Sequence, residues 1–198
     1  MANRFQHSNR CGKLVLKINM ANFQIFWPIL LNDEGFYANK PGDTGGETWE
    51  GISRNNYPNW VGWSIVDSHK GRPDFPHCLR ADTTLQALVI TFYENHFWEE
   101  MQGDAINNQS IANMIGDWGV NAGLSVPVKH TQIILGVDVV GVLGPKTLAA
   151  INGANQQDFF NKLKAARIQF YHDVVAAHTN DSQFLGDWLQ RTNSITFQ

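Results

Sequence analysis

Three polar residues of the types that glycosidic bond cleavage requires follow one another near the start of the chain: Glu34, Asp43 and Thr48. A carboxylic acid protonates the glycosidic oxygen, while a second carboxylate or polar group across from it stabilises positive charge or activates water. The residue types therefore predict a glycosidase active site, with Glu34 as the general acid and Asp43 and Thr48 as its assistants. Glu47 and Glu50 are alternative second carboxylates, unless strand alternation beside Thr48 turns them to solvent.

The segment before Glu34 has the pattern of an amphipathic helix with one buried stripe. Glu34 continues this stripe, and Gly35 is a typical helix stop. A partly buried carboxyl group at the negative end of a helix favours its protonated form, as a general acid requires. Pro28 leaves the start of the helix open, because proline interrupts a helix unless it falls in the first turn. The apolar stripe consists of Phe23, Phe26, Trp27, Leu30 and Leu31.

A glycine-rich stretch follows the glutamate and predicts a small hairpin. Thr48 and Ile52 suit short strands, and the glycines around them permit tight turns. We expect this hairpin to fold back over the end of the helix and to place Asp43 and Thr48 across a cleft from Glu34. The glycines are Gly42, Gly45, Gly46 and Gly51.

Several motifs resemble one known family. Glu-Gly-x-Tyr at 34–37 and Asp-x-Gly-Gly-x-Thr-x-x-Gly-Ile-Ser at 43–53 resemble the N-terminal signature of glycoside hydrolase family 108, the lysozyme-like N-acetylmuramidases of phages, prophages and bacteria. Asp-x-x-x-Asn-x-Gly at 117–123 resembles a further segment of that family. Gly-x-x-Gly-Pro-x-Thr at 141–147 resembles a turn in its predicted peptidoglycan-binding region. The resemblance extends over about residues 22–192.

The resemblance implies a mainly α, lysozyme-like helical fold with a small β-hairpin element beside the active-site cleft. It implies an enzyme that cleaves the β-1,4 bond between N-acetylmuramic acid and N-acetylglucosamine in peptidoglycan glycan strands, in phage or prophage lysis or in cell-wall remodelling. Glu34 would be its catalytic acid, with Asp43 and Thr48 in supporting roles. Substrate-binding roles would fall to Tyr37, Trp49, Asp117 and Asn121.

Some of these roles have structural alternatives. Asp117 and Asn121 share a helix face, so they either reach the cleft or brace the fold internally. Phe36 stands where the family usually has a second glycine, and Val140 stands where an aspartate is common. A catalytically silent peptidoglycan-binding or secretion-assisting protein of the same fold is therefore the alternative function. The aromatic residues after the motif stack on sugars or pack in the core: Trp49, Tyr57, Trp60 and Trp63.

Composition and charge restrict the classes of function. The chain has 198 residues, 43% of them hydrophobic, and a net charge of -3, which argues against a nucleic-acid-binding protein with a basic surface. We expect Cys11 and Cys78 to be free thiols, with a disulfide between them as the alternative. No run of apolar residues is long enough for a transmembrane helix or for the core of a cleavable signal peptide. Synthesis in the bacterial cytoplasm and action on the cell wall after release are therefore expected.

Metal and cofactor chemistry is not predicted. The seven histidines are scattered, and neither His-Glu-x-x-His nor Cys-x-x-Cys is present. Gly62-Trp63-Ser64-Ile65-Val66 lacks the closing glycine of a serine hydrolase elbow, and the chain has no P-loop.

The resemblance also implies a division of the chain into three parts. We predict an N-terminal extension at 1–19, with translation from Met20 as an open alternative, a catalytic region at 20–123, and a predicted peptidoglycan-binding helical region at 124–198 packed on the first. The stretch 58–76 is expected to be a long loop lining the cleft. Helices are predicted from Thr83 with Asp82 or Thr83 as cap, around 111–118, and at 125–135, 145–151, 159–174 and 184–191.

Overall fold

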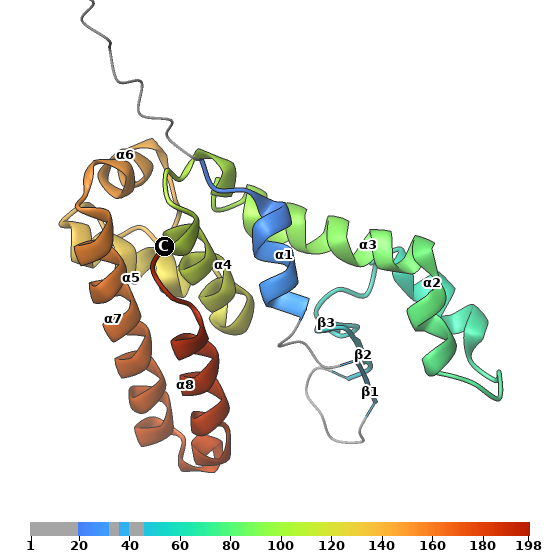
Figure 1. Ribbon diagram of the computed structural model, residues 1–198. Helices are drawn as coiled ribbons and strands as arrows, with labels where there is room; N and C mark the ends of the chain where they lie inside the picture. Colours follow the sequence, from blue (N-terminus) through green and yellow to red (C-terminus); the bar gives the residue numbers. More distant parts are fainter. Residues whose placement is uncertain (1–19, 32–35, 40–45) are drawn as a thin grey trace, which may run out of the picture.

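The structure is a computed structural model that describes residues 20–31, 36–39 and 46–198. It is mostly helical with a small antiparallel sheet, which confirms the predicted fold class. Helices α4 to α8 gather on one side, α2 and α3 extend to the other, and α1 lies between them above the sheet (Figure 1). In chain order the elements are α1 Phe23–Leu31, β1 Tyr37–Ala38, β2 Thr48–Trp49, β3 Ile52–Ser53, α2 Gly62–His69, η1 His77–Ala81, α3 Thr83–Tyr93, η2 Glu94–Glu99, η3 Gly103–Ala105, α4 Gln109–Ala122, α5 Ser125–Leu135, α6 Pro145–Gly153, α7 Gln156–Ala177, η4 Thr179–Phe184 and α8 Leu185–Ser194.

Helix α1 buries the part of the predicted stripe that the structure describes, from Phe23 to Leu30. The side chains of Phe23, Phe26 and Leu30 are buried, and the Phe26 ring stacks on Trp98 with centroids 5.3 Å apart. Asn22 precedes the helix, and its Oδ1 accepts a hydrogen bond from the backbone N–H of Gln24 at 2.7 Å, as N-cap residues do. Pro28 lies inside the helix rather than in its first turn. Packing of large aromatic side chains therefore supports a helix that proline weakens.

The sheet has three short antiparallel strands in the order β1-β2-β3. Tyr37 lies opposite Trp49 between β1 and β2, and Thr48 lies opposite Ser53 between β2 and β3. The strands predicted at Thr48 and Ile52 are confirmed. Glu50 and Gly51 connect β2 to β3 with φ angles of 43° and 79°, the left-handed pair that a tight hairpin turn requires.

One predicted loop contains a helix. Within the stretch 58–76, α2 runs from Gly62 to His69 and buries Trp63 and Val66. The Pro, Gly, Asn and Asp residues of this stretch hide its helical period in the sequence, and α2 itself is short and has no side-chain N-cap. Gly62 is needed at its start, since a Cβ there would lie 2.3 Å from the ring of Trp60.

Helices α3 and α4 correspond to the helices predicted from Thr83 and around 111–118. Asp82 caps α3 by accepting a hydrogen bond from the backbone N–H of Leu85 at 2.8 Å, and the chain continues from α3 into the π-helical η2. Asn108 caps α4 in the same way, and Gly123 ends α4 with a φ of 83°. The stripe of Ile111, Met114, Ile115 and Trp118 on α4 is fully buried.

The C-terminal helices pack on α4 and continue the same core. Helix α5 spans the predicted 125–135, while α6, α7 and α8 each differ from the predicted bounds by a few residues at one or both ends. Asn152 joins the two parts, because its side chain accepts from the backbone N–H of Asn107 at 2.9 Å and donates to the carbonyl of Ala105 at 2.8 Å. Among the described residues, no helix is both long and apolar enough to span a membrane.

Candidate functional site

The structure describes only some of the predicted site residues. Glu34 and Asp43, the predicted acid and its partner, lie outside the described residues, as does Cys11. Thr48 lies half-buried on β2, and its hydroxyl donates a hydrogen bond to the carbonyl of Gly46 at 3.3 Å. The roles of all three predicted catalytic residues therefore stay predictions.

Glu47 is buried at the edge of the sheet and is bound by cations. Its Oε2 lies 2.8 Å from Arg54 Nε and 2.9 Å from Lys70 Nζ. The hydroxyl of Tyr37 donates to the other oxygen of Glu47 at 3.0 Å. Burial, and then the adjacent Glu47 carboxylate, raise the pKa of Tyr37, so its hydroxyl stays protonated as a donor. These contacts fix the sheet and leave Glu47 poorly suited to a role as second carboxylate.

Asp67 extends this ion-pair cluster from the sheet to α2. The guanidinium of Arg54 donates to both Asp67 oxygens, at 2.7 and 3.0 Å, and Lys70 Nζ lies 2.7 Å from one of them. The hydrogen bonds from Arg54, followed by those from Lys70, lower the pKa of Asp67 to about 2. The Arg54 guanidinium also lies 4.3 Å from the ring centroid of Trp63. The cluster therefore anchors α2 against the sheet.

Glu50 has a different environment from Glu47. Its carboxylate accepts a hydrogen bond from Gln86 Nε2 at 3.0 Å, and its carbonyl accepts one from the Tyr93 hydroxyl at 2.7 Å. Burial raises the pKa of Glu50, against the smaller opposing effects of the Gln86 hydrogen bond and the Arg80 charge. Neither the Glu47 nor the Glu50 side chain is turned to open solvent. The exposure that strand alternation beside Thr48 would have given them is therefore not observed.

The prediction that Trp49 binds a sugar requires correction. Its side chain is fully buried, and its ring lies 4.8 Å from that of Phe36. No face of the Trp49 ring is open to a ligand, because β2 turns this side chain into the core. Tyr57 and Trp60, from the same aromatic group, are half-buried and retain exposed surface.

Asp117 also braces the fold rather than reaching the cleft. Its side chain is 0% exposed, and so is that of Arg167, whose Nη2 lies 2.6 Å from Asp117 Oδ2. Arg191 Nη2 lies 2.9 Å from the other oxygen. Asn121 is exposed, and its Oδ1 accepts a hydrogen bond from the Tyr171 hydroxyl at 2.8 Å. Of the two predicted interpretations, the structure shows internal bracing for Asp117, where α4 meets α7 and α8.

A cleft lies between the sheet, α3 and the end of α4. A cavity of about 230 Å³ is bordered by Gly51 and Ser53 of the hairpin and by Gly119 of α4. A second cavity of about 430 Å³ shares Asn56, Tyr57 and Phe92 with the first, so the two adjoin. Trp60 and His96 also line this second cavity. Aromatic rings with a few amide groups are the surfaces on which protein sites commonly bind sugars.

Sequence reasoning had missed part of this cleft. Gly119 and Val120 belong to the motif at 117–123, in which only the polar side chains of Asp117 and Asn121 indicate a role in binding. Gly119 is required by packing, since a Cβ there would lie 2.4 Å from Leu124 Cδ2. Small residues that form a cleft wall have no chemistry of their own to identify them in a sequence.

Metal chemistry has no evident site in the described part of the chain. Within it, no three His, Cys, Asp or Glu residues are grouped to hold a metal ion. Cys78 is a free, half-buried thiol.

Comparison with known proteins identifies two similar domains and a similar solved structure. Residues 27–123 match the family model described as glycosyl hydrolase 108, and residues 126–193 match that of the predicted peptidoglycan domain. The structure of Brucella abortus SagA has a TM-score of 0.62 to this chain at 27% sequence identity, covering 87% of this chain and 90% of SagA. No curated protein matches the sequence.

The two matched domains define the class of protein as a glycoside hydrolase with a peptidoglycan hydrolase-like role. The chain carries a domain of the glycosyl hydrolase 108 family, followed by the predicted peptidoglycan domain.

Proposed function

We propose that the protein is an N-acetylmuramidase that cleaves the β-1,4 bond between N-acetylmuramic acid and N-acetylglucosamine. Glu34 donates a proton to the leaving oxygen, while Asp43, assisted by Thr48, stabilises the developing positive charge or orients the attacking water. The observation that carries this proposal is the match to the glycosyl hydrolase 108 family over residues 27–123, which includes all three residues.

The two adjoining cavities support binding of an extended glycan. A strand that passes the hairpin at Gly51 and continues along the cavity of Tyr57 and Trp60 meets amide and aromatic groups in succession. The ring of Trp60 packs edge-to-face against the ring of Trp63, with centroids 5.2 Å apart, and this contact restricts its movement. A fixed, half-buried indole offers a stacking surface at low cost in side-chain entropy.

The cellular role follows from the same proposal. The enzyme is made in the bacterial cytoplasm and acts on the cell wall after release, in phage or prophage lysis or in wall remodelling. The predicted peptidoglycan domain at 126–193 supports retention on the same polymer.

Digestion of purified peptidoglycan tests this function. Wild type, Glu34→Gln and the matched surface variant Glu99→Gln are incubated with the wall, and the new reducing ends are identified by mass spectrometry. We expect N-acetylmuramic acid ends from the wild type and Glu99→Gln and none from Glu34→Gln. N-acetylglucosamine ends would refute the bond assignment. Failure of the wild type to cleave any wall type across pH would refute the enzyme and favour a peptidoglycan-binding protein.

A Trp60→Ala variant tests the glycan path separately. Loss of a stacking surface that contacts substrate and transition state equally raises KM and leaves kcat unchanged. An unchanged KM would show that the strand does not cross Trp60.

A further inference from the structure

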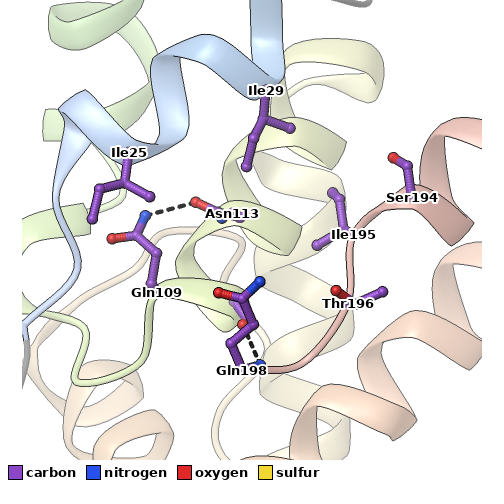
Figure 2. A pocket seen from close by; sticks show the side chains of 9 residues that line it. Ile25, Ile29, Gln109, Asn113, Ser194, Ile195, Thr196 and Gln198 are labelled. Carbon is purple, nitrogen blue, oxygen red and sulfur yellow. Dashed lines mark hydrogen bonds between the residues drawn. The ribbon is translucent and has the colours of Figure 1, made fainter.

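A separate groove lies on the other side of α1 from the sheet. It has a volume of about 470 Å³ and is formed by α1, the first turns of α4 and the segment that follows α8 (Figure 2). None of its residues lines the two cavities of the cleft described above. The described residues that line it are Ile25, Ile29, Gln109, Ser110, Asn113, Ser194, Ile195, Thr196 and Gln198.

The amide group of Gln109 is fully engaged in this groove. Its Oε1 accepts from the backbone N–H of Asn22 at 2.7 Å. Its Nε2 donates to the carbonyl of Asn22 at 3.2 Å and to Oδ1 of Asn113 at 2.7 Å. Because the backbone of Asn22 fixes which end of the Gln109 amide is oxygen, Gln109 in turn fixes the orientation of the Asn113 amide.

This relay leaves the Asn113 Nδ2 group as an oriented donor. Asn113 is 7% exposed, and Nδ2 makes no hydrogen bond to another described residue, although Oδ1 is engaged. Nδ2 is not among the enclosed polar atoms of the described residues, so it is open to the groove. Figure 2 shows the Asn113 side chain in the middle of the groove, between the isoleucines of α1 and Ile195. The donor is thus placed for an acceptor that enters the groove.

Apolar side chains flank this donor. Ile25 is 55% exposed, and Ile25 and Ile29 lie one turn apart on α1, away from the face that packs in the core. Ile195 faces them from the segment after α8. No charged side chain is among the described residues that line the groove. Its chemistry therefore suits a neutral group that combines a carbonyl acceptor with a methyl group.

We propose that this groove is a second carbohydrate site, which binds the acetamido group of an N-acetylated amino sugar. Asn113 Nδ2 donates to the acetamido carbonyl, and the isoleucines contact its methyl group. The absence of cationic side chains from the described lining favours the glycan over the wall peptides, whose carboxylates would enter unpaired. The inference rests on the proposed function for the source of the sugar, and the binding chemistry stands on the groove alone.

Methyl NMR on the full chain tests the site directly. Isoleucine δ1 methyl groups are labelled with ¹³C, and the protein is titrated with the tetramer of N-acetylglucosamine or with cellotetraose, a neutral glucose tetramer that lacks the acetamido group. We expect saturable shifts of the Ile25, Ile29 and Ile195 signals with the acetylated tetramer only. Equal binding of cellotetraose would overturn the acetamido assignment.

Two variants identify the groups responsible. Asn113→Asp keeps the acceptor for Gln109 but replaces the Nδ2 donor with an oxygen, and we expect affinity at the groove to fall about tenfold or more. Ile25→Ser weakens the same signals, whereas the matched change Ile133→Ser, at an exposed isoleucine of α5 outside the groove, leaves them unchanged. If Asn113→Asp does not fold, as judged by circular dichroism, the Ile25 and Ile133 pair decides.

The outcomes separate this inference from the proposed function. Shifts confined to Ile52, which neighbours the cleft residues Gly51 and Ser53, would overturn the second site and leave the muramidase proposal intact. Absence of any groove shift while the wild type still cleaves peptidoglycan would do the same. Groove shifts in a protein that cleaves no wall would support the second site and refute the muramidase.

Discussion

The buried ion pairs of Asp117 provide the sharpest prediction about stability. Asp117 and Arg167 are both completely buried, and Arg191 is 10% exposed. Asp117→Asn retains the shape of the side chain but removes the negative charge, so the Arg167 guanidinium is left in the core without its counter-charge. Removal of one partner from a buried ion pair typically costs about 3–5 kcal/mol.

This cost converts to a measurable change in melting temperature. The unfolding entropy is about 2.1 cal/mol/K per residue, or about 0.4 kcal/mol/K for a chain of 198 residues. The expected decrease in Tm is therefore about 7 to 12 °C. Calorimetry and urea denaturation, with the free energy of unfolding obtained from the midpoint and slope, measure it.

A control and a double variant test the reasoning. Asp138→Asn removes a carboxylate whose side chain is 83% exposed and which lies 3.8 Å from Lys146 Nζ, so it should change the free energy by less than about 0.5 kcal/mol. Asp117→Asn combined with Arg167→Met removes both buried charges and should be more stable than Asp117→Asn alone. A loss below about 1 kcal/mol for Asp117→Asn, or additive losses in the double variant, would refute the uncompensated-charge argument.

Three further predictions concern the sheet and the helices. Because Arg54 lowers the folded pKa of Asp67 to about 2, Asp67 stabilises the fold above its unfolded pKa, and this stabilisation is lost as pH falls toward 2. In Asp67→Asn the free energy of unfolding, measured from urea midpoints, should fall less with decreasing pH, by at most about 1 kcal/mol. An NMR titration midpoint of Asp67 near 4 would contradict this prediction. Burial raises the folded pKa of Glu50, so the charge of Glu50 destabilises the fold as pH rises through that pKa. Glu50→Gln should therefore raise the urea midpoint at pH 7 but not at pH 4. An equal rise at both pH values would show that burial of the charge is not the cause. Asn108→Ala removes the acceptor for the Ile111 backbone N–H and should lower the free energy of unfolding by about 1 kcal/mol, as measured by chemical denaturation. An unchanged free energy would show that Asn108 does not stabilise α4 as its N-cap.

Local patterns in the sequence determined most of the helices and the strands. The apolar stripes of α1 and α4, the cap at Asp82, and the residues Thr48 and Ile52 predicted their elements because periodicity and capping act over a few neighbouring positions. Helix α2 is not predicted from the sequence, because these local signals are weak there. Its short length, absent side-chain cap and neighbouring proline and glycine residues outweigh a weak period.

The tertiary structure alone decided the roles of the polar and aromatic residues. Asp117 could either bind substrate or brace the fold from its sequence position, and the arginine residues that decide between these roles lie 50 and 74 positions further along the chain. Trp49 could stack on a sugar until β2 was seen to turn it into the core. The sequence indicates no role for Ile25 and Ile29, whereas in the structure they line a groove together with residues of α4 and of the segment after α8. The sequence thus determined which segments form helices and strands, since those interactions are local. The partners of buried charges and the walls of clefts depend on contacts between distant segments, which only the folded chain brings together.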